Sequence, residues 1–133
     1  MVEVSGGSRM MPTLDLQNVC ESGCGVTIGG FHCKTMDMAQ NLSALQKKMR
    51  NIDTIAQCEY EGYVLVVACS SKYLSTSEIA SVDVFRREHH RFFSDLQKFI
   101  SVTKARNILG LSLSGSLGSF TLTVLYQRPS PGE

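Results

Sequence analysis

Apolar positions along the chain follow two periods, one typical of helices and one typical of strands. After Thr35, apolar residues recur at spacings of four and three, which places them on one helix face: Met38, Leu42, Leu45, Met49 and Ile52. Thr35 is a suitable N-cap, and Lys47 and Lys48 fall in the last turns, where cations suit the helix dipole. The pattern therefore predicts a first helix in this segment.

The segment before Lys104 predicts a second, longer helix. Its apolar stripe also recurs at spacings of three and four: Val82, Phe85, His89, Phe92, Leu96 and Phe99. Ser75 with Glu78 fits a capping box, and Ser81 is an alternative start. Phe93 and Ile100 widen the stripe, and a stripe of this width normally faces a core.

The remaining apolar runs predict strands. Residues 13–19 and 25–34 form a first extended pair, with Gly29-Gly30 as a tight turn or a bulge. Residues 54–70 form a hairpin that turns at 61–62, and its second arm is apolar on both faces, as in a central, covered strand.

The last hairpin alternates cleanly. One face of its first arm carries Leu109, Leu111 and Leu113, and one face of its second arm carries Phe120, Leu122, Val124 and Tyr126. Such alternation is typical of an antiparallel sheet with one wetted face.

The predicted element order is ββ–α–ββ–α–ββ. This order indicates an α+β fold: an antiparallel sheet built from hairpins, with both helices on one face. One domain spans residues 13–127, between a flexible N-terminal segment (1–12) and a flexible tail (128–133). The order hints at a repeated ββα unit, but residue identities do not repeat.

Composition narrows the class of protein. The 133 residues are 43% hydrophobic and 19% charged, which is typical of one globular domain. Lys and Arg number 13 against 12 Asp and Glu, so no overall field favours nucleic acid or an anionic membrane. The N-terminus lacks the pattern of a secretory signal, and the longest apolar run (63–69) is too short to span a bilayer. With an odd count of five cysteines, these features predict reduced thiols in a cytoplasmic or nuclear protein without a membrane partner.

A sulfur-rich stretch raises the question of a metal or thiol site. Cys20, Cys24, His32 and Cys33 are possible zinc ligands, but adjacent strand residues point to opposite faces, so His32 and Cys33 diverge. The stretch also lacks the paired C-x-x-C of common zinc and redox modules. We therefore expect no metal and no cofactor. A metal-dependent or thiol enzyme built on Cys20, Cys24 and Cys33 remains a third hypothesis.

The remaining motifs do not assemble a catalytic centre. Residues 114–118 (SGSLG) resemble a nucleophile elbow but lack its first glycine and lie between two strands. His89 lies on the apolar stripe, where a core or rim histidine is the ordinary interpretation and a pH switch or a general base is the alternative. We expect no catalytic residues.

These observations favour a non-enzymatic protein-interaction domain, a small subunit or adaptor of an intracellular complex. Its partner would be another protein or a second copy. It would dock at a sheet edge formed by the last strand, through Phe120, Leu122, Val124 and Tyr126, or on one face of either helix. Nucleic-acid binding is the alternative hypothesis. It would use the basic face of the second helix and the cations near it: Arg86, Arg87, Arg91, Lys98, Lys104 and Arg106. Glu88 and Asp95 partly neutralise that face.

Overall fold

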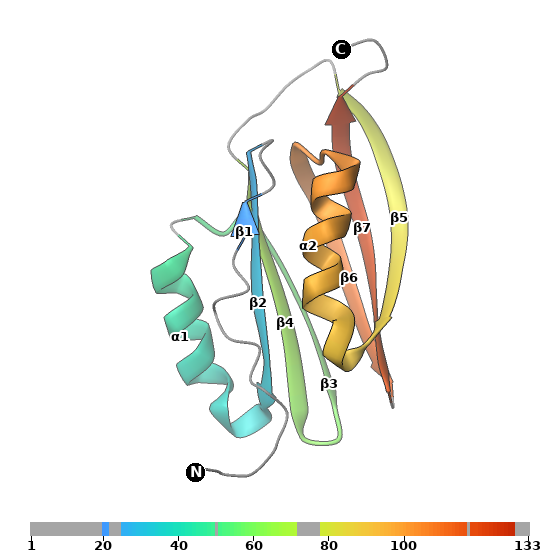
Figure 1. Ribbon diagram of the computed structural model, residues 1–133. Helices are drawn as coiled ribbons and strands as arrows, with labels where there is room; N and C mark the ends of the chain where they lie inside the picture. The colour runs from blue at the N-terminus through green and yellow to red at the C-terminus, as the bar shows by residue number, and fades with distance from the viewer. Residues whose placement is uncertain (1–19, 22–24, 50, 72–77, 117, 130–133) are drawn as a thin grey trace.

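The computed structural model describes residues 20–21, 25–49, 51–71, 78–116 and 118–129 (Figure 1). The strands are β1 (Cys20–Glu21), β2 (Val26–Lys34), β3 (Thr54–Tyr60), β4 (Tyr63–Ser71), β5 (Glu78–Glu88), β6 (Asn107–Ser116) and β7 (Ser119–Pro129). The α-helices are α1 (Met38–Lys48) and α2 (Phe92–Thr103), each preceded by a short 3-10 helix, η2 (Thr35–Asp37) and η3 (His89–Arg91). The predicted strand 13–19 and the N-terminal segment 1–12 lie outside the described residues, as does most of the tail.

The strands form two antiparallel sheets. The first has the order β1-β2-β4-β3 and the second has the order β5-β7-β6. The edge strands β3 and β6 lie side by side, and the hydroxyl of Thr54 donates to the carbonyl of Ile108 at 3.4 Å. The α+β class is confirmed, and the predicted order holds with one further strand, β5.

The central hairpin forms as the sequence predicts. Glu61 and Gly62 both have positive φ (46° and 80°), which is the backbone of a type I′ turn. Residues 64–69 are all buried, because β4 is the inner strand between β2 and β3. An apolar run in such a strand faces a cover on both sides.

The helices do not share one face of a single sheet, as the sequence analysis expected. Helix α1 packs on one face of the first sheet, where Leu45 meets Phe31 and Val66 in one apolar cluster. Helix α2 lies between the two sheets and contributes Leu96 to a second cluster that holds β2, β4 and all three strands of the second sheet. The order of layers is therefore α1, first sheet, α2, second sheet (Figure 1). Because β2 and β4 are apolar on both faces, one helix alone could not cover them.

Two local predictions were wrong. Gly29 and Gly30 pair with Ala68 and Val67 in an unbroken ladder, so they form neither a turn nor a bulge. Thr35 opens η2 instead of capping α1, and its backbone N–H donates to the carbonyl of Gly62 at 2.8 Å. The N-cap residue of α1 is Asp37.

The largest error concerns the second helix. Residues 78–88 form β5, which pairs with β7 along its whole length, and only the part from Phe92 onwards is α-helical. Phe85 points toward α2 and is buried, whereas Val82 and Val84 are exposed on the opposite face. The spacing of Val82 and Phe85 imitated a helical stripe, although the two side chains lie on different faces of a strand.

The described chain contains two copies of one structural unit. The segments β2–η2–α1–β3–β4 and β5–η3–α2–β6–β7 have the same element order, and in both the first strand pairs with the last. The strand registers agree as well. In the first half Ile28 pairs with Cys69, and in the second half Val82 pairs with Leu125. The offset between the halves is 54 residues on the first strand (82 − 28) and 56 residues on the last (125 − 69). The repeat is thus βαββ, with different boundaries from the ββα unit at which the sequence hints.

Candidate functional site

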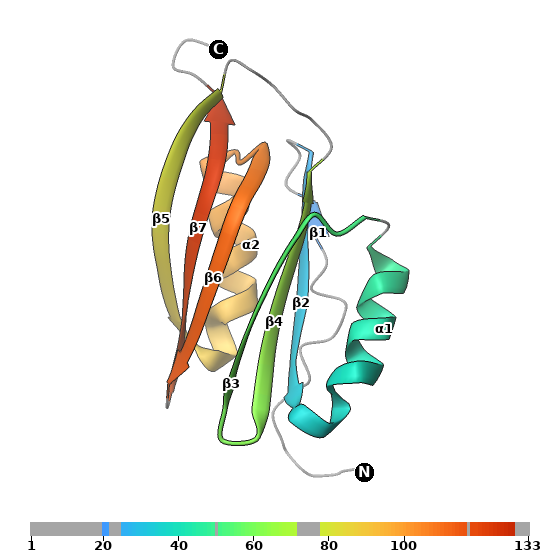
Figure 2. The same ribbon diagram turned by 180° about the vertical axis from the view of Figure 1, so that it is seen from behind.

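The second sheet has one face that no described element covers. This outer face carries the side chains that alternate with the buried ones: Ala80, Val82, Val84 and Arg86 of β5, Ser112 and Ser114 of β6, and Thr121, Thr123 and Leu125 of β7. Figure 2 shows this face toward the viewer, with α2 behind the sheet. The three largest apolar side chains of the face adjoin, since Val82 lies opposite Leu125 and Val84 is two residues further along β5.

The repeat supplies an internal comparison for this face. The corresponding face of the first sheet is covered by α2, and there Ile28, Val67 and Cys69 are 2%, 0% and 0% exposed. On the outer face, Val82 and Leu125 are 62% and 38% exposed. The same strand positions are therefore buried under a helix in one half and open in the other.

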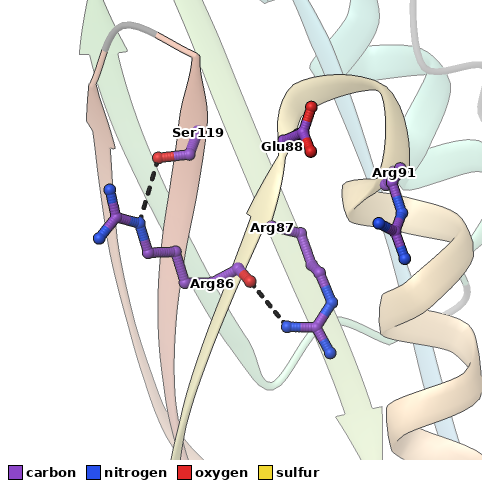
Figure 3. Close-up of a pocket in the computed structure, with 5 residues that line it drawn as sticks. All are labelled: Arg86, Arg87, Glu88, Arg91 and Ser119. Atoms are coloured by element: carbon purple, nitrogen blue, oxygen red, sulfur yellow. Dashed lines mark hydrogen bonds between the residues drawn. The ribbon is translucent and has the colours of Figure 1, made fainter.

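Arginines gather at the end of β5, around an open hollow of about 540 Å³ that adjoins the outer face (Figure 3). Its lining residues come from β5, η3 and the start of β7: Arg86, Arg87, Glu88, Arg91 and Ser119. Arg86 belongs to the outer face, and its Nε donates to the hydroxyl of Ser119 at 3.3 Å.

The other two guanidinium groups are held by one carboxylate. Arg87 donates to Asp95 at 3.1 Å and Arg91 lies 3.2 Å from the same oxygen. Arg87 also stacks over Phe85, at 4.4 Å from the ring centre. Arg86 is thus the arginine of this group whose guanidinium bonds to a neutral hydroxyl instead of a carboxylate.

A second polar cluster lies where the two halves meet. The hydroxyl of Tyr60 is 2.5 Å from Nε2 of His32 and 3.4 Å from Nδ1 of His89. His89 Nε2 is 3.3 Å from the carbonyl oxygen of Ser116. Because a carbonyl only accepts, His89 Nε2 donates in this contact. The Tyr60 hydroxyl thus bridges one histidine from each half of the chain.

Burial decides the protonation of this cluster. Desolvation, together with a smaller charge repulsion from His89, lowers the pKa of His32 to about 4. Burial also raises the pKa of Tyr60 to about 12. At neutral pH both groups are uncharged, and the ring of Phe120 packs against both (centroids 5.0 and 5.6 Å away). The cluster joins the two halves with neutral hydrogen bonds.

The structure places the predicted protein-binding residues in the core. Strand β7 is the central strand of the second sheet, so the expectation that it forms an edge is wrong. The four side chains concerned are at most 3% exposed and face α2: Phe120, Leu122, Val124 and Tyr126. The edge strand is β5, which the sequence analysis assigned to a helix.

The six residues predicted to bind nucleic acid do not lie together in one patch. Arg86, Arg87 and Arg91 line the hollow together, whereas Lys104 caps the opposite end of α2, roughly 18 Å away at 1.5 Å per residue. Arg106 lies beyond Lys104, and Lys98 is exposed on the helix between the two groups.

Two of the possible ligands in the sulfur-rich stretch diverge. His32 and Cys33 face opposite sides of β2, as the alternation predicts, and burial raises the pKa of the Cys33 thiol. Cys24 lies outside the described residues. Among the residues described, His, Cys, Asp and Glu side chains do not form a group of three or more that could hold a metal ion. Across the described ranges, α1 and α2 both lack the length and hydropathy of a membrane span.

The outer face is the feature that sequence reasoning missed. Its signal was the alternation of Ser81, Asp83 and Phe85 with Val82 and Val84, a period of two hidden beneath an apparent helical stripe. Comparison with known proteins gives no match to a family model, to a curated protein or to a solved structure.

Proposed function

We propose that this chain is a non-enzymatic protein-interaction domain, a small subunit or adaptor that docks its partner on the outer face of the second sheet. One observation carries the proposal: the apolar pair Val82 and Leu125 is exposed, whereas the corresponding pair in the first half, Ile28 and Cys69, is buried under α2. Adjoining exposed apolar side chains with a polar rim are typical of docking surfaces.

The charge distribution supports a protein partner over nucleic acid. Asp95 and Glu88 lie among the three arginines at the hollow, and the remaining cations of the basic set lie elsewhere along α2 and beyond it. A backbone-binding surface would require the cations to be contiguous.

Native mass spectrometry of the protein taken gently from its own cells tests the proposal. We expect a mass above the 14.6 kDa of one chain, and we expect Val84→Lys to shift most of the signal to 14.6 kDa, because a lysine on the outer face opposes apolar docking.

Val102→Lys is the matched control, since Val102 is 79% exposed on α2, away from the outer face. A wild-type protein that occurs only at 14.6 kDa would overturn the proposal, as would equal loss of the complex in both variants.

A further inference from the structure

The outer face is a three-stranded surface whose dimensions suit one helix. Neighbouring strands lie about 4.8 Å apart, so β5, β7 and β6 present a surface roughly 14 Å wide, close to the 10–12 Å diameter of a helix with its side chains. Within this chain, the corresponding surface of the first sheet is covered by a single helix, α2. The repeat therefore shows what kind of element fits this surface.

We infer that the occupant of the outer face is an amphipathic α-helix of another protein, with an acidic residue in its first turn beside Arg86. This inference rests on the proposed function and specifies the partner. The direction of the partner helix is inferred from that of α2. The N-terminal end of α2 meets β2 near Gly30, and His89, in the η3 helix just before α2, contacts His32. Arg86 occupies in β5 the place that His32 occupies in β2, as judged from their cross-strand partners Thr121 and Leu65.

The position of Arg86 agrees with the inferred direction of the partner helix. Among the nine outer-face side chains named above, Arg86 is the charged one, and it stands at the end where the helix would begin. Glu88, two residues further along β5, lines the hollow beside it and lies 3.9 Å from His90. An acidic side chain in the first turn also suits the helix dipole. The hollow beside Arg86 and Ser119 leaves room for that turn.

Side-chain size specifies the helix further. In the first half, the ring of Phe93 packs on Gly30, where an added Cβ would lie 2.7 Å from Cζ. The corresponding position of the second sheet is Val84. The partner helix therefore carries a small residue opposite Val84, where α2 has a phenylalanine, and its larger apolar residues meet Val82 and Leu125 one turn further on.

Within the described residues, neither helix of a second copy offers such a face. The side of α1 away from its own sheet is polar and exposed, with Gln40, Lys47 and Lys48 on it. Helix α2 already packs its apolar side between the two sheets, and its exposed side carries Lys98 and Ser101 beside Val102.

Photo-crosslinking in the native cells tests the inference, with benzoylphenylalanine as the probe at position 82, 84 or 125, one at a time, and at 102 as the control. We expect adducts from the three outer-face positions, and none above background from 102. The attached residues, mapped by mass spectrometry, should fall in one segment at spacings of three or four.

Adducts to a second copy of this chain, or to residues spaced two apart as in a strand, would overturn the helix while leaving the proposed function in place. The absence of specific adducts at all three positions would overturn both.

A charge reversal provides the second arm. We expect Arg86→Glu to reduce the yield of adduct from position 84 by about tenfold, and Arg86→Lys to retain most of it, because the attraction is to a carboxylate. Lys98→Glu makes the same charge change on the exposed side of α2 and should leave the yield unchanged. An equal effect of Arg86→Glu and Lys98→Glu would overturn the assigned acidic first turn.

Discussion

At the scale of single residues, His32 is the histidine that the fold buries. It is 3% exposed, stacks near Tyr60 and Tyr63, and meets His89 from the other half of the chain. Carboxylates are missing from the described contacts of its ring, so a proton on His32 has nothing to balance it there. The native state therefore favours neutral His32.

This environment makes the folded state sensitive to acid. The folded pKa of His32 (about 4) lies below the ordinary histidine value of 6.5, so the native state binds fewer protons than the unfolded state. Stability is therefore lost as pH falls from 6.5 toward 4. At pH 4 the loss amounts to roughly 3 kcal/mol of unfolding free energy. Urea denaturation should show this loss in the wild-type protein and its absence in His32→Gln, which cannot titrate.

His90→Gln is the control, because the His90 side chain is 72% exposed. It should retain the wild-type pH dependence. Parallel curves for the wild-type protein and His32→Gln between pH 7 and 4 would contradict the assignment of the neutral state.

At the scale of elements, the β3–β4 hairpin depends on two residues in the left-handed region. Gly62 tolerates φ of 80° at no steric cost, whereas Glu61 at φ 46° does not. Asparagine is the side chain that best adopts this conformation at the first position of a type I′ turn. The natural turn therefore holds a strained residue that substitution can relieve.

We expect Glu61→Asn to raise the free energy of unfolding by about 0.5–1 kcal/mol, as measured by urea denaturation. Glu61→Gln removes the same charge without the conformational preference, so it should give no gain. A gain of equal size in both variants would assign the effect to charge.

The elements also show how far the sequence determines the fold. The helical face of α1 and the buried run of β4 were predicted because burial and period agree there. Strand β5 was not predicted, because its outward side carries Val82 and Val84 while its inward side carries Asp83. The Asp83 carboxylate accepts a hydrogen bond from the hydroxyl of Tyr126 at 2.5 Å. When a strand turns its polar side chain inward and its apolar side chains outward, its hydrophobic pattern no longer shows the period of two that identifies a strand.

The candidate site was harder to predict than the fold, for a related reason. A side chain's role at a surface depends on what covers that surface. Helix α2 covers the inner face of the first sheet but not the corresponding outer face of the second sheet. The predicted binding strand β7 was read correctly as a strand, but its place between β5 and β6 depends on pairings distant in sequence. Local alternation cannot distinguish an edge strand from a central one.

At the scale of the whole molecule, α2 contributes to the packing of both sheets, whereas α1 contributes to the packing of one. Leu45 of α1 and Leu96 of α2 are 0% and 1% exposed, but Leu45 packs against the first sheet alone, whereas Leu96 belongs to the cluster shared by both sheets. Loss of packing at Leu96 therefore reaches both halves.

We expect Leu45→Ala and Leu96→Ala each to cost about 2–5 kcal/mol of unfolding free energy. Hydrogen exchange should separate them: Leu96→Ala accelerates exchange in both β4 and β7, and Leu45→Ala does so mainly in α1. Identical exchange patterns would show that the two clusters open as one unit.

The shared helix also sets an order of events during synthesis. When residue 71 has left the ribosome, the first sheet is complete but its inner face still lacks α2, which ends 32 residues later at Thr103 (103 − 71). At about 5–20 residues per second, that face stays open for roughly 2–6 s. The inner face of the nascent first half therefore stays exposed to water until the second half of the chain emerges to cover it.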